Sequence, residues 1–366
     1  MKKFAIILSL LLAVSLLAGC AGTPVVYYTN CTCPTGSHDV TVQTPTEEPT
    51  PAETLPAPAE GALKTGLYIA TGISDSKSAA GEEAGEAKYD VTMVAVLVDD
   101  NGIIHDCIID GISTSVKFDA AGALVTDLTA APQTKNELGE NYGMVAWGGA
   151  IAEWDAQAAA LADFVVGKDA GALRGVAVSE SGYAPEGTDL AASATIYLGG
   201  YVEAIELAAG TAKHLGAQAG DTLKLATITG IDGSTAATAE KDGTAQLDAT
   251  VTALTMNGDV ITSCAIDAVQ AKVSFDTTGT ITSDIGGAVS TKNQLGEQYG
   301  MVAWGGAIAE WDVQTASFAS YITGKTLDEV MGIAVNEGTK PTDADLASSV
   351  TIAIGGFQAL IAKAAQ

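Results

Sequence analysis

Residues 135–168 read KNELGENYGMVAWGGAIAEWDAQAAALADFVVGK, and residues 292–325 repeat this stretch as KNQLGEQYGMVAWGGAIAEWDVQTASFASYITGK. The copies lie 157 positions apart, and the same offset joins shorter motifs upstream of them. A near-constant offset over so long a span indicates a duplication. Because only two copies of domain length are present, the sequence predicts two tandem repeat domains, residues 62–212 and 213–366, and not a solenoid of short units.

The order of elements within a repeat follows from the hydrophobic pattern. Apolar and polar residues alternate over residues 91–109 around a turn at residues 100–102, which predicts an antiparallel hairpin. Residues 150–167 are Ala-rich with helical periodicity, which predicts a helix that packs on the sheet. A last strand over residues 194–198 and a helix over residues 201–208 are expected to end the repeat. The predicted fold class is therefore α+β, in two tandem copies of an antiparallel-sheet-plus-helices domain. The apolar stripe of the long helix is expected to consist of Ile151, Trp154, Ala158, Leu161 and Val165.

The composition restricts the possible partners. The 366 residues carry 17 Lys plus Arg against 44 Asp plus Glu, for a formal net charge of −27, which argues against nucleic acid as a partner. Hydrophobic residues make up 47% of the chain but aromatic residues only 5%, so we expect folded domains with cores of small aliphatic side chains. Arg174 is the single arginine, which leaves little material for bidentate phosphate or carboxylate clamps.

The N-terminal residues predict export and a membrane anchor. Two lysines precede an apolar run over residues 4–18, which is too short for a transmembrane helix but has the length of a signal-peptide core. The run ends in LAGC, and this sequence resembles the lipobox of bacterial lipoproteins. The resemblance implies a signal peptide over residues 1–19 and a palmitate-type lipid on Cys20, which would hold the protein to the extracytoplasmic face of the cell membrane. An ordinary secretory signal with a chance cysteine is the alternative.

Residues 20–61 are rich in Pro and Thr and have no amphipathic period. This composition predicts a disordered stalk that separates the folded domains from the membrane. Cys31 and Cys33 lie in the stalk without a partner pair at zinc spacing, so we interpret them as incidental or mutually oxidised thiols and predict no metal site.

All four tryptophans belong to the repeated segment, and two interpretations of them stay open. In the first, the indoles anchor an Ala-rich core, and the glycine pair after the first of them allows a tight entry into the helix. In the second, they form the wall of a small-ligand site whose free backbone N–H groups meet the ligand. The tryptophans are Trp147, Trp154, Trp304 and Trp311, and the site would also include Lys135, Tyr142 and Met144 with their counterparts Lys292, Tyr299 and Met301.

No catalytic constellation is evident. Glu153 and Asp155 are two residues apart on a predicted helix and point in different directions, so we expect a solvated acidic face and no catalytic pair. None of the three histidines has a counterpart in the other repeat, and serine-triad, P-loop, dinucleotide and zinc-protease motifs are absent. Cys107 and Cys264 are equivalent positions, which are either buried small hydrophobes or a disulfide between the repeats.

The end of each repeat resembles the FMN-binding domain family of sodium-pumping and electron-bifurcating respiratory complexes and of surface flavolipoproteins. In that family a threonine closes the motif Asp-x-x-Ser-Gly-Ala-Thr and carries FMN through its phosphate. Here Asp189 to Thr195 and Asp345 to Thr351 keep the separation, and a helix follows. The repeated block also resembles lipoproteins related to the major membrane immunogen group.

The resemblance implies two FMN-binding-like domains in a lipid-anchored, flavin-based electron relay with a redox partner at the cell surface. The alternative is a redox-inactive surface lipoprotein, either ligand-binding or structural, in which the attachment motif has degenerated. Cys20 is the predicted lipidation site. The predicted cofactor-binding residues are Thr195, Thr351, Asp189, Asp345, Tyr142, Tyr299, Trp147 and Trp304.

Overall fold

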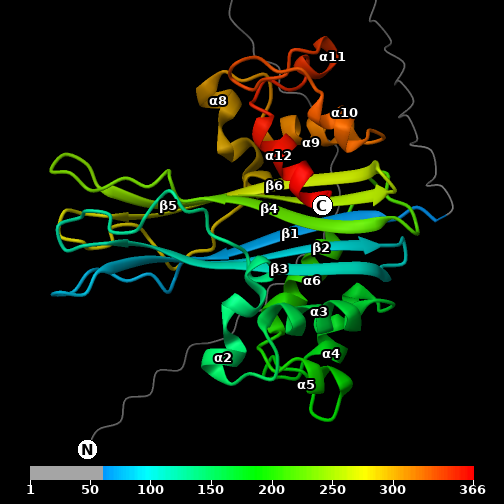
Figure 1. Ribbon diagram of the computed structural model, residues 1–366, viewed down its shortest axis with the longest axis horizontal. Coiled ribbons are helices and arrows are strands. Elements are labelled where there is room, and N and C mark those ends of the chain that lie inside the picture. Colours follow the sequence, from blue (N-terminus) through cyan, green and yellow to red (C-terminus); the bar gives the residue numbers. More distant parts are fainter. Residues whose placement is uncertain (1–60) are drawn as a thin grey trace, which may run out of the picture. The chain divides into compact units, whose positions relative to one another are not determined.

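A computed structural model describes residues 61–366 (Figure 1). The predicted signal peptide, the lipidation of Cys20 and all but the last residue of the predicted stalk lie outside the described residues. Within the described part, no helix is both long and apolar enough to cross a lipid bilayer.

The first repeat begins with a three-stranded antiparallel sheet. Its strands are β1 (Lys64–Gly72), β2 (Gly85–Val98) and β3 (Ile104–Phe118), in the order β1-β2-β3. The turn between β2 and β3 is held by Asp99, whose carboxylate accepts the backbone N–H groups of Asn101 and Ile103 at 2.9 Å each. The predicted hairpin is confirmed, although both strands are longer than the alternating pattern indicates.

The second repeat has a sheet of the same design. Its strands are β4 (Thr222–Gly230), β5 (Gly243–Asn257) and β6 (Val260–Phe275), in the order β4-β5-β6. The strand pair β5–β6 shifts its register near the turn, as the pair β2–β3 does. The predicted α+β class with two antiparallel sheets and helices is therefore confirmed.

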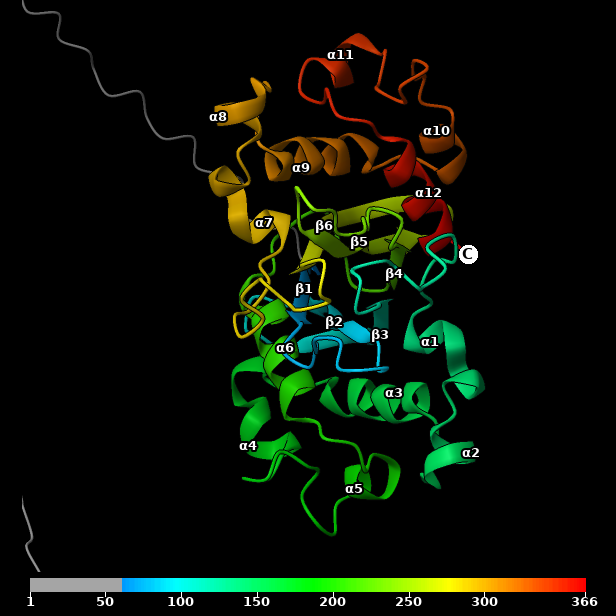
Figure 2. The ribbon, with the colours of Figure 1, turned by 90° about the vertical axis from the view of Figure 1, so that its left-hand side faces the viewer.

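Helices follow each sheet along the chain and cover its outer face (Figures 1 and 2). In the first repeat they are α1 (Lys135–Leu138), η1 (Gly139–Tyr142), α2 (Met144–Gly148), α3 (Trp154–Val165), η2 (Ala170–Ala172), α4 (Leu173–Ala177), α5 (Asp189–Ser193) and α6 (Gly199–Gly210). In the second they are α7 (Lys292–Leu295), η3 (Gly296–Tyr299), α8 (Met301–Gly305), α9 (Trp311–Ile322), α10 (Leu327–Met331), α11 (Ala344–Ala347) and α12 (Gly355–Ala364).

Two local predictions were wrong. Residues 194–198 form no strand, because the N–H groups of Thr195 and Ile196 donate to the side chain of Gln157 and not to a neighbouring strand. Helix α3 begins at Trp154, so Ile151 precedes the helix and is exposed, whereas the other members of the predicted stripe are buried. The expected helix over residues 201–208 is present within α6.

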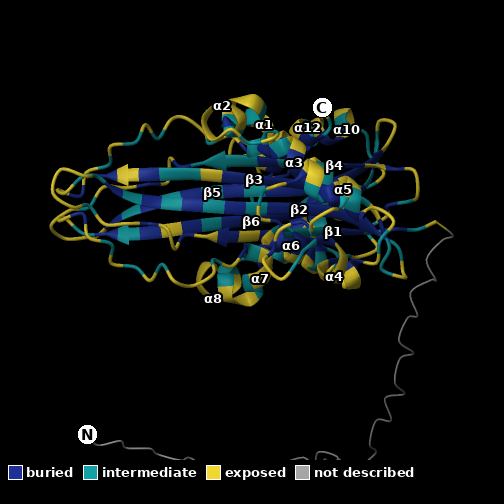
Figure 3. Ribbon diagram, turned by 90° about the horizontal axis from the view of Figure 1, so that it is seen from below, coloured by how far each residue is buried: buried dark blue, intermediate teal, exposed yellow. Residues whose placement is uncertain are grey.

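The two sheets pack face to face, so that the described part has four layers: helices, sheet, sheet and helices (Figure 2). Residues of both sheets share one core, which includes Tyr89 and Met93 from the first sheet and Leu247 and Val251 from the second. On the outer faces, separate apolar clusters hold the helices of each repeat. The central strands β2 and β5 are therefore buried on both faces where the helices cover the sheets, and on one face elsewhere (Figure 3).

The contacts between the repeats are reciprocal. Ala79 donates its N–H to Gly279 at 2.8 Å, and Ala237 donates to Gly122 at 2.8 Å. Phe118 stacks on its counterpart, with ring centroids 3.9 Å apart and an interplanar angle of 1°. Exchange of equivalent contacts is the property of a two-fold interface, so the duplicated halves are related like the subunits of a symmetric dimer.

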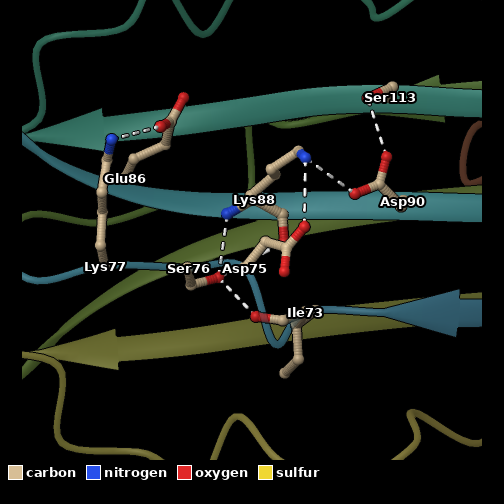
Figure 4. Close-up of polar contacts among 8 residues, drawn as sticks. All are labelled: Ile73, Asp75, Ser76, Lys77, Glu86, Lys88, Asp90 and Ser113. Carbon is tan, nitrogen blue, oxygen red and sulfur yellow. Dashed lines mark hydrogen bonds and ion pairs between the residues drawn. The ribbon is translucent and has the colours of Figure 1, made fainter.

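The helices leave one end of each sheet uncovered, and the outer face there is polar. On β2, Lys88 pairs with Asp75 at 3.4 Å and Asp90 at 3.3 Å, and Glu86 pairs with Lys77 at 3.5 Å (Figure 4). These pairs are largely solvent-exposed and contribute little to stability. The candidate functional residues of the described part lie at the helix-covered end.

Candidate functional site

Each repeat holds a lysine against two aromatic rings. The Nζ of Lys135 lies 4.8 Å from the ring centroid of Trp154 and 5.3 Å from that of Tyr142. In the second repeat, Lys292 lies 4.9 Å from both Trp311 and Tyr299. The structure therefore brings Tyr142 to Lys135, as the ligand-wall interpretation expects, but cation–π contacts already cover these ring faces.

A buried aspartate positions this lysine. Asp110 on β3 accepts N–H groups from Asn136 at 3.1 Å and from Gly111 at 2.7 Å, and Asp267 makes the equivalent contacts in the second repeat. Burial raises the pKa of Asp110 above its usual value, although hydrogen bonds from the start of α1 oppose the shift. Sequence reasoning missed this contact, and its only signal was an aspartate at equivalent positions of two strands, within short apolar stretches.

Glu153 caps the short helix α2. Its carboxylate accepts the N–H groups of Met144 at 2.7 Å and Val145 at 3.0 Å, and Glu310 does the same for α8 at 2.8 and 3.0 Å. The predicted solvated acidic face is therefore wrong for these glutamates. The neighbouring Asp155 and its counterpart each have one buried carboxylate oxygen without a hydrogen-bond partner among the described residues.

The two candidate attachment threonines contact a buried glutamine. The Oε1 of Gln157 accepts the N–H of Thr195 at 2.8 Å, its hydroxyl at 3.2 Å and the N–H of Ile196 at 3.2 Å. In the second repeat, Gln314 accepts the N–H and hydroxyl of Thr351 at 2.8 and 3.2 Å. Thr195 is exposed and Thr351 is half-buried.

Aromatic residues near the two threonines differ between the repeats. Two residues after Thr195, Tyr197 makes an edge contact with Tyr183, with centroids 5.6 Å apart, and both rings are about half exposed. The counterpart of Tyr197 is Ala353, so the second repeat has no such pair. Gly182 permits the close approach of Tyr197, because a Cβ there would lie 2.2 Å from the ring.

The members of each tryptophan pair occupy opposite environments. Trp154 and Trp311 are 3% and 6% exposed, whereas Trp147 and Trp304 are 90% and 83% exposed. The core-anchor interpretation is therefore right for the second tryptophan of each pair and wrong for the first. The carboxylates of Asp189 and Asp345 are exposed at short helices, and no hydrogen bond of the described part joins them, or Trp147, to the attachment threonines.

The equivalent cysteines do not form a disulfide. Cys107 and Cys264 are buried free thiols that belong to the separate outer clusters of the two repeats, so the disulfide alternative is wrong. Burial raises the pKa of both thiols, that of Cys264 to about 12.

The cavities described lie away from these residues. One of about 380 Å³ is lined by Tyr321, Lys325 and Asp343, and one of about 500 Å³ is lined by Arg174 and Glu206. No group of three or more metal-ligating side chains occurs in residues 61–366. Comparison of the chain with protein-family models, with curated proteins and with solved structures finds no match.

Proposed function

We propose that the protein carries FMN on Thr195 and serves as a flavin-based electron relay, held at the extracytoplasmic face of the membrane by lipid on Cys20. The single observation that carries this proposal is the exposed hydroxyl-bearing Thr195 beside the exposed pair Tyr183 and Tyr197. A phosphoester to Thr195 needs an accessible hydroxyl, and a planar ring system needs aromatic surface nearby.

The residues of the chain would orient the group. Gln157 fixes the backbone of Thr195 through the 2.8 Å hydrogen bond, and the ring of Tyr197 stands on the same segment. FMN supplies the electron-transfer chemistry when it is bound, while the protein supplies attachment and orientation. No acid–base residue is required of the chain.

The two repeats are unequal in this role. Thr351 is half-buried, the residue before it is the fully buried Val350, and Ala353 replaces the tyrosine. We therefore assign the flavin to the first repeat. The second repeat then has a structural role, because its sheet completes the shared core.

The hydrogen-bond donors around Thr195 favour a second candidate function, that of a redox-inactive surface binding protein. All three donors that converge there already bind the oxygen of Gln157, which leaves none for a phosphate. The only arginine, Arg174, pairs with Glu203 and Glu206, at 3.6 and 3.3 Å. Ser193 stands where the attachment motif has glycine.

An absorbance spectrum after coexpression with a flavin transferase tests the proposal. We expect flavin bands that persist after denaturation and gel filtration, that disappear in Thr195→Ala and that remain in the matched variant Thr351→Ala. Bands that denaturation removes, or a protein without colour, would reject covalent attachment. A colourless protein that also fails to bind added FMN would favour the redox-inactive function.

A further inference from the structure

Two equivalent groups contain the four most exposed large apolar side chains of the described part, Trp147, Trp304, Ile151 and Ile308. We call the set Val145, Trp147 and Ile151 the first tryptophan patch and the set Val302, Trp304 and Ile308 the second. Every member is at least 45% exposed, and each patch occupies a short helix, α2 or α8, and the turn that follows it. Isolated exposed apolar residues are common, but a cluster that includes a fully exposed tryptophan is a typical interaction site.

The local structure holds each patch in place. Gly143 and Gly149 have positive φ angles of 80° and 63°, which start and end α2 abruptly. The carboxylate of Glu153 binds the first two N–H groups of the helix, and Gly149 donates its N–H back to the helix. Helix α8 has the same contacts from Glu310 and Gly306. A short helix fixed at both ends loses little further freedom on binding, which favours recognition.

Comparison of the repeats argues against a purely structural reason for the patches. Residues 142–155 and 299–312 are identical at every position, whereas the two repeats differ at many positions elsewhere. Packing accounts for the buried Trp154 and Trp311 in this segment, but not for Trp147 and Trp304, which contribute almost nothing to a core. Exposed residues that are unchanged after a duplication are explained by a shared binding role.

Charge around the patches indicates the class of partner. Of the acidic residues in 136–155, Glu153 caps α2 and Glu137 pairs with Lys363, which leaves Glu140 and Asp155, and no Lys or Arg occurs in this stretch. The lysine that directly precedes it, Lys135, is already held against two aromatic rings. Residues 293–312 likewise contain only acidic charged residues. The whole chain has a net charge of −27. An indole is also the aromatic ring that binds cations best. We propose that each tryptophan patch docks a basic, apolar segment of a partner polypeptide, with a Lys or Arg side chain on the indole and an aliphatic side chain against its neighbours.

The arrangement of the patches predicts the stoichiometry. Helices α2 and α8 lie on the outer sides of different sheets, on opposite sides of the sandwich (Figures 1 and 2), and both carry exposed residues. One short segment therefore cannot contact both patches. We expect two equivalent sites per chain, and a partner with two such segments gains from avidity.

A titration with defined peptides tests this proposal in the purified full chain. The probe is a fluorescein-labelled peptide of alternating Lys and Leu, and the comparison peptides alternate Lys with Ser and Glu with Leu. We expect two sites for the Lys–Leu peptide and weaker, salt-sensitive binding of the Lys–Ser peptide, because an acidic protein attracts any polycation. The Glu–Leu peptide should not bind.

Variants separate patch binding from general attraction. Trp147→Ala and Trp304→Ala should each remove one site, and the double variant should bind the Lys–Leu peptide at least about tenfold more weakly. Val125→Ala, an exposed apolar residue outside both patches, is the matched control and should bind like the wild type. Unchanged affinity in the double variant would overturn the proposal, as would equal binding of neutral oligosaccharides or zwitterionic vesicles. The result does not depend on flavin, because all measurements use protein without added cofactor.

Discussion

At the scale of single residues, burial decides what the repeated positions can do. Cys107 and Cys264 are equivalent in sequence, as a catalytic or disulfide pair would be, yet each lies within its own apolar cluster. Trp147 and Trp154 are equally invariant between the repeats, yet one is exposed and the other is buried. Equivalence between repeats therefore identifies residues under constraint, but the constraint can be packing in one case and surface display in the other.

The buried thiols predict a decrease in stability at alkaline pH. Burial raises the pKa of Cys107 and Cys264 above the unfolded value, so the unfolded chain loses these protons first as the pH rises. The contribution of the protonated thiols to the free energy of unfolding is complete below about pH 8.5. Above that pH it decreases by up to about 1.4 kcal/mol per pH unit for each thiol. For Cys264 the decrease continues until the folded pKa of about 12.

Urea unfolding under reducing conditions at several pH values above and below the unfolded pKa measures this effect. The double variant Cys107→Ala, Cys264→Ala is expected to be less stable at neutral pH, because it leaves small cavities, but its stability should change less with pH. The same pH dependence in the variant and the wild type would show that other groups are responsible. Buried Tyr89, whose pKa is also raised by burial, contributes only at still higher pH.

At the scale of elements, the sequence predicts what depends on local periodicity. The prediction of the hairpin is confirmed because the alternation of apolar and polar residues and the turn at Asp99–Gly102 are local properties of the sequence. Residues 194–198 have the apolar character of a strand, but the side chain of Gln157, 38 positions away, accepts their N–H groups. The exposure of Trp147 depends in the same way on the cap from Glu153. Tertiary hydrogen bonds of this kind leave no periodic signal in the sequence.

Removal of the cap tests how α2 is held. Glu153→Ala leaves the N–H groups of Met144 and Val145 without their acceptor, so the variant should lose about 1 kcal/mol of stability. These two amides should exchange hydrogen faster than in the wild type, while α3 stays protected. Glu140→Ala is the matched control, because Glu140 is an exposed acidic residue of the preceding turn whose side chain accepts no hydrogen bond in the described part. Unchanged exchange at both amides would mean that the glycines alone define α2.

At the scale of the whole described unit, the two repeats share a core and do not stand as separate hydrophobic bodies. The inner face of each sheet packs on the other sheet and on loop residues that follow the strands, and Phe118 and Phe275 stack at equivalent positions between the sheets. Gly85 and Gly243 line these rings, and a Cβ at either position would lie within 2.5 Å of one. Duplication is evident from the sequence, but this face-to-face packing is not, because alternating strands show that a face is buried without showing what covers it.

The shared core predicts that a change in one repeat destabilises the other. Phe118→Ala removes a fully buried ring from the stack and should lower the free energy of unfolding by about 3–5 kcal/mol, with unfolding still in a single transition. Phe275→Ala should have a similar effect. The double variant should lose less than the sum of the two, because the rings contact each other directly.

Hydrogen exchange read in the second repeat distinguishes a shared core from two independent ones. In Phe118→Ala, amides of β5 and β6 should lose protection although no residue of the second repeat has changed. Phe164→Ala is the control, because Phe164 packs only against the outer cluster of the first repeat, and its removal should act more strongly on α3 than on β6. If Phe118→Ala left exchange in β5 and β6 at the wild-type rate, the repeats would be energetically independent despite their contact. Coupled loss of protection would instead show that the two repeats stabilise each other through the shared core.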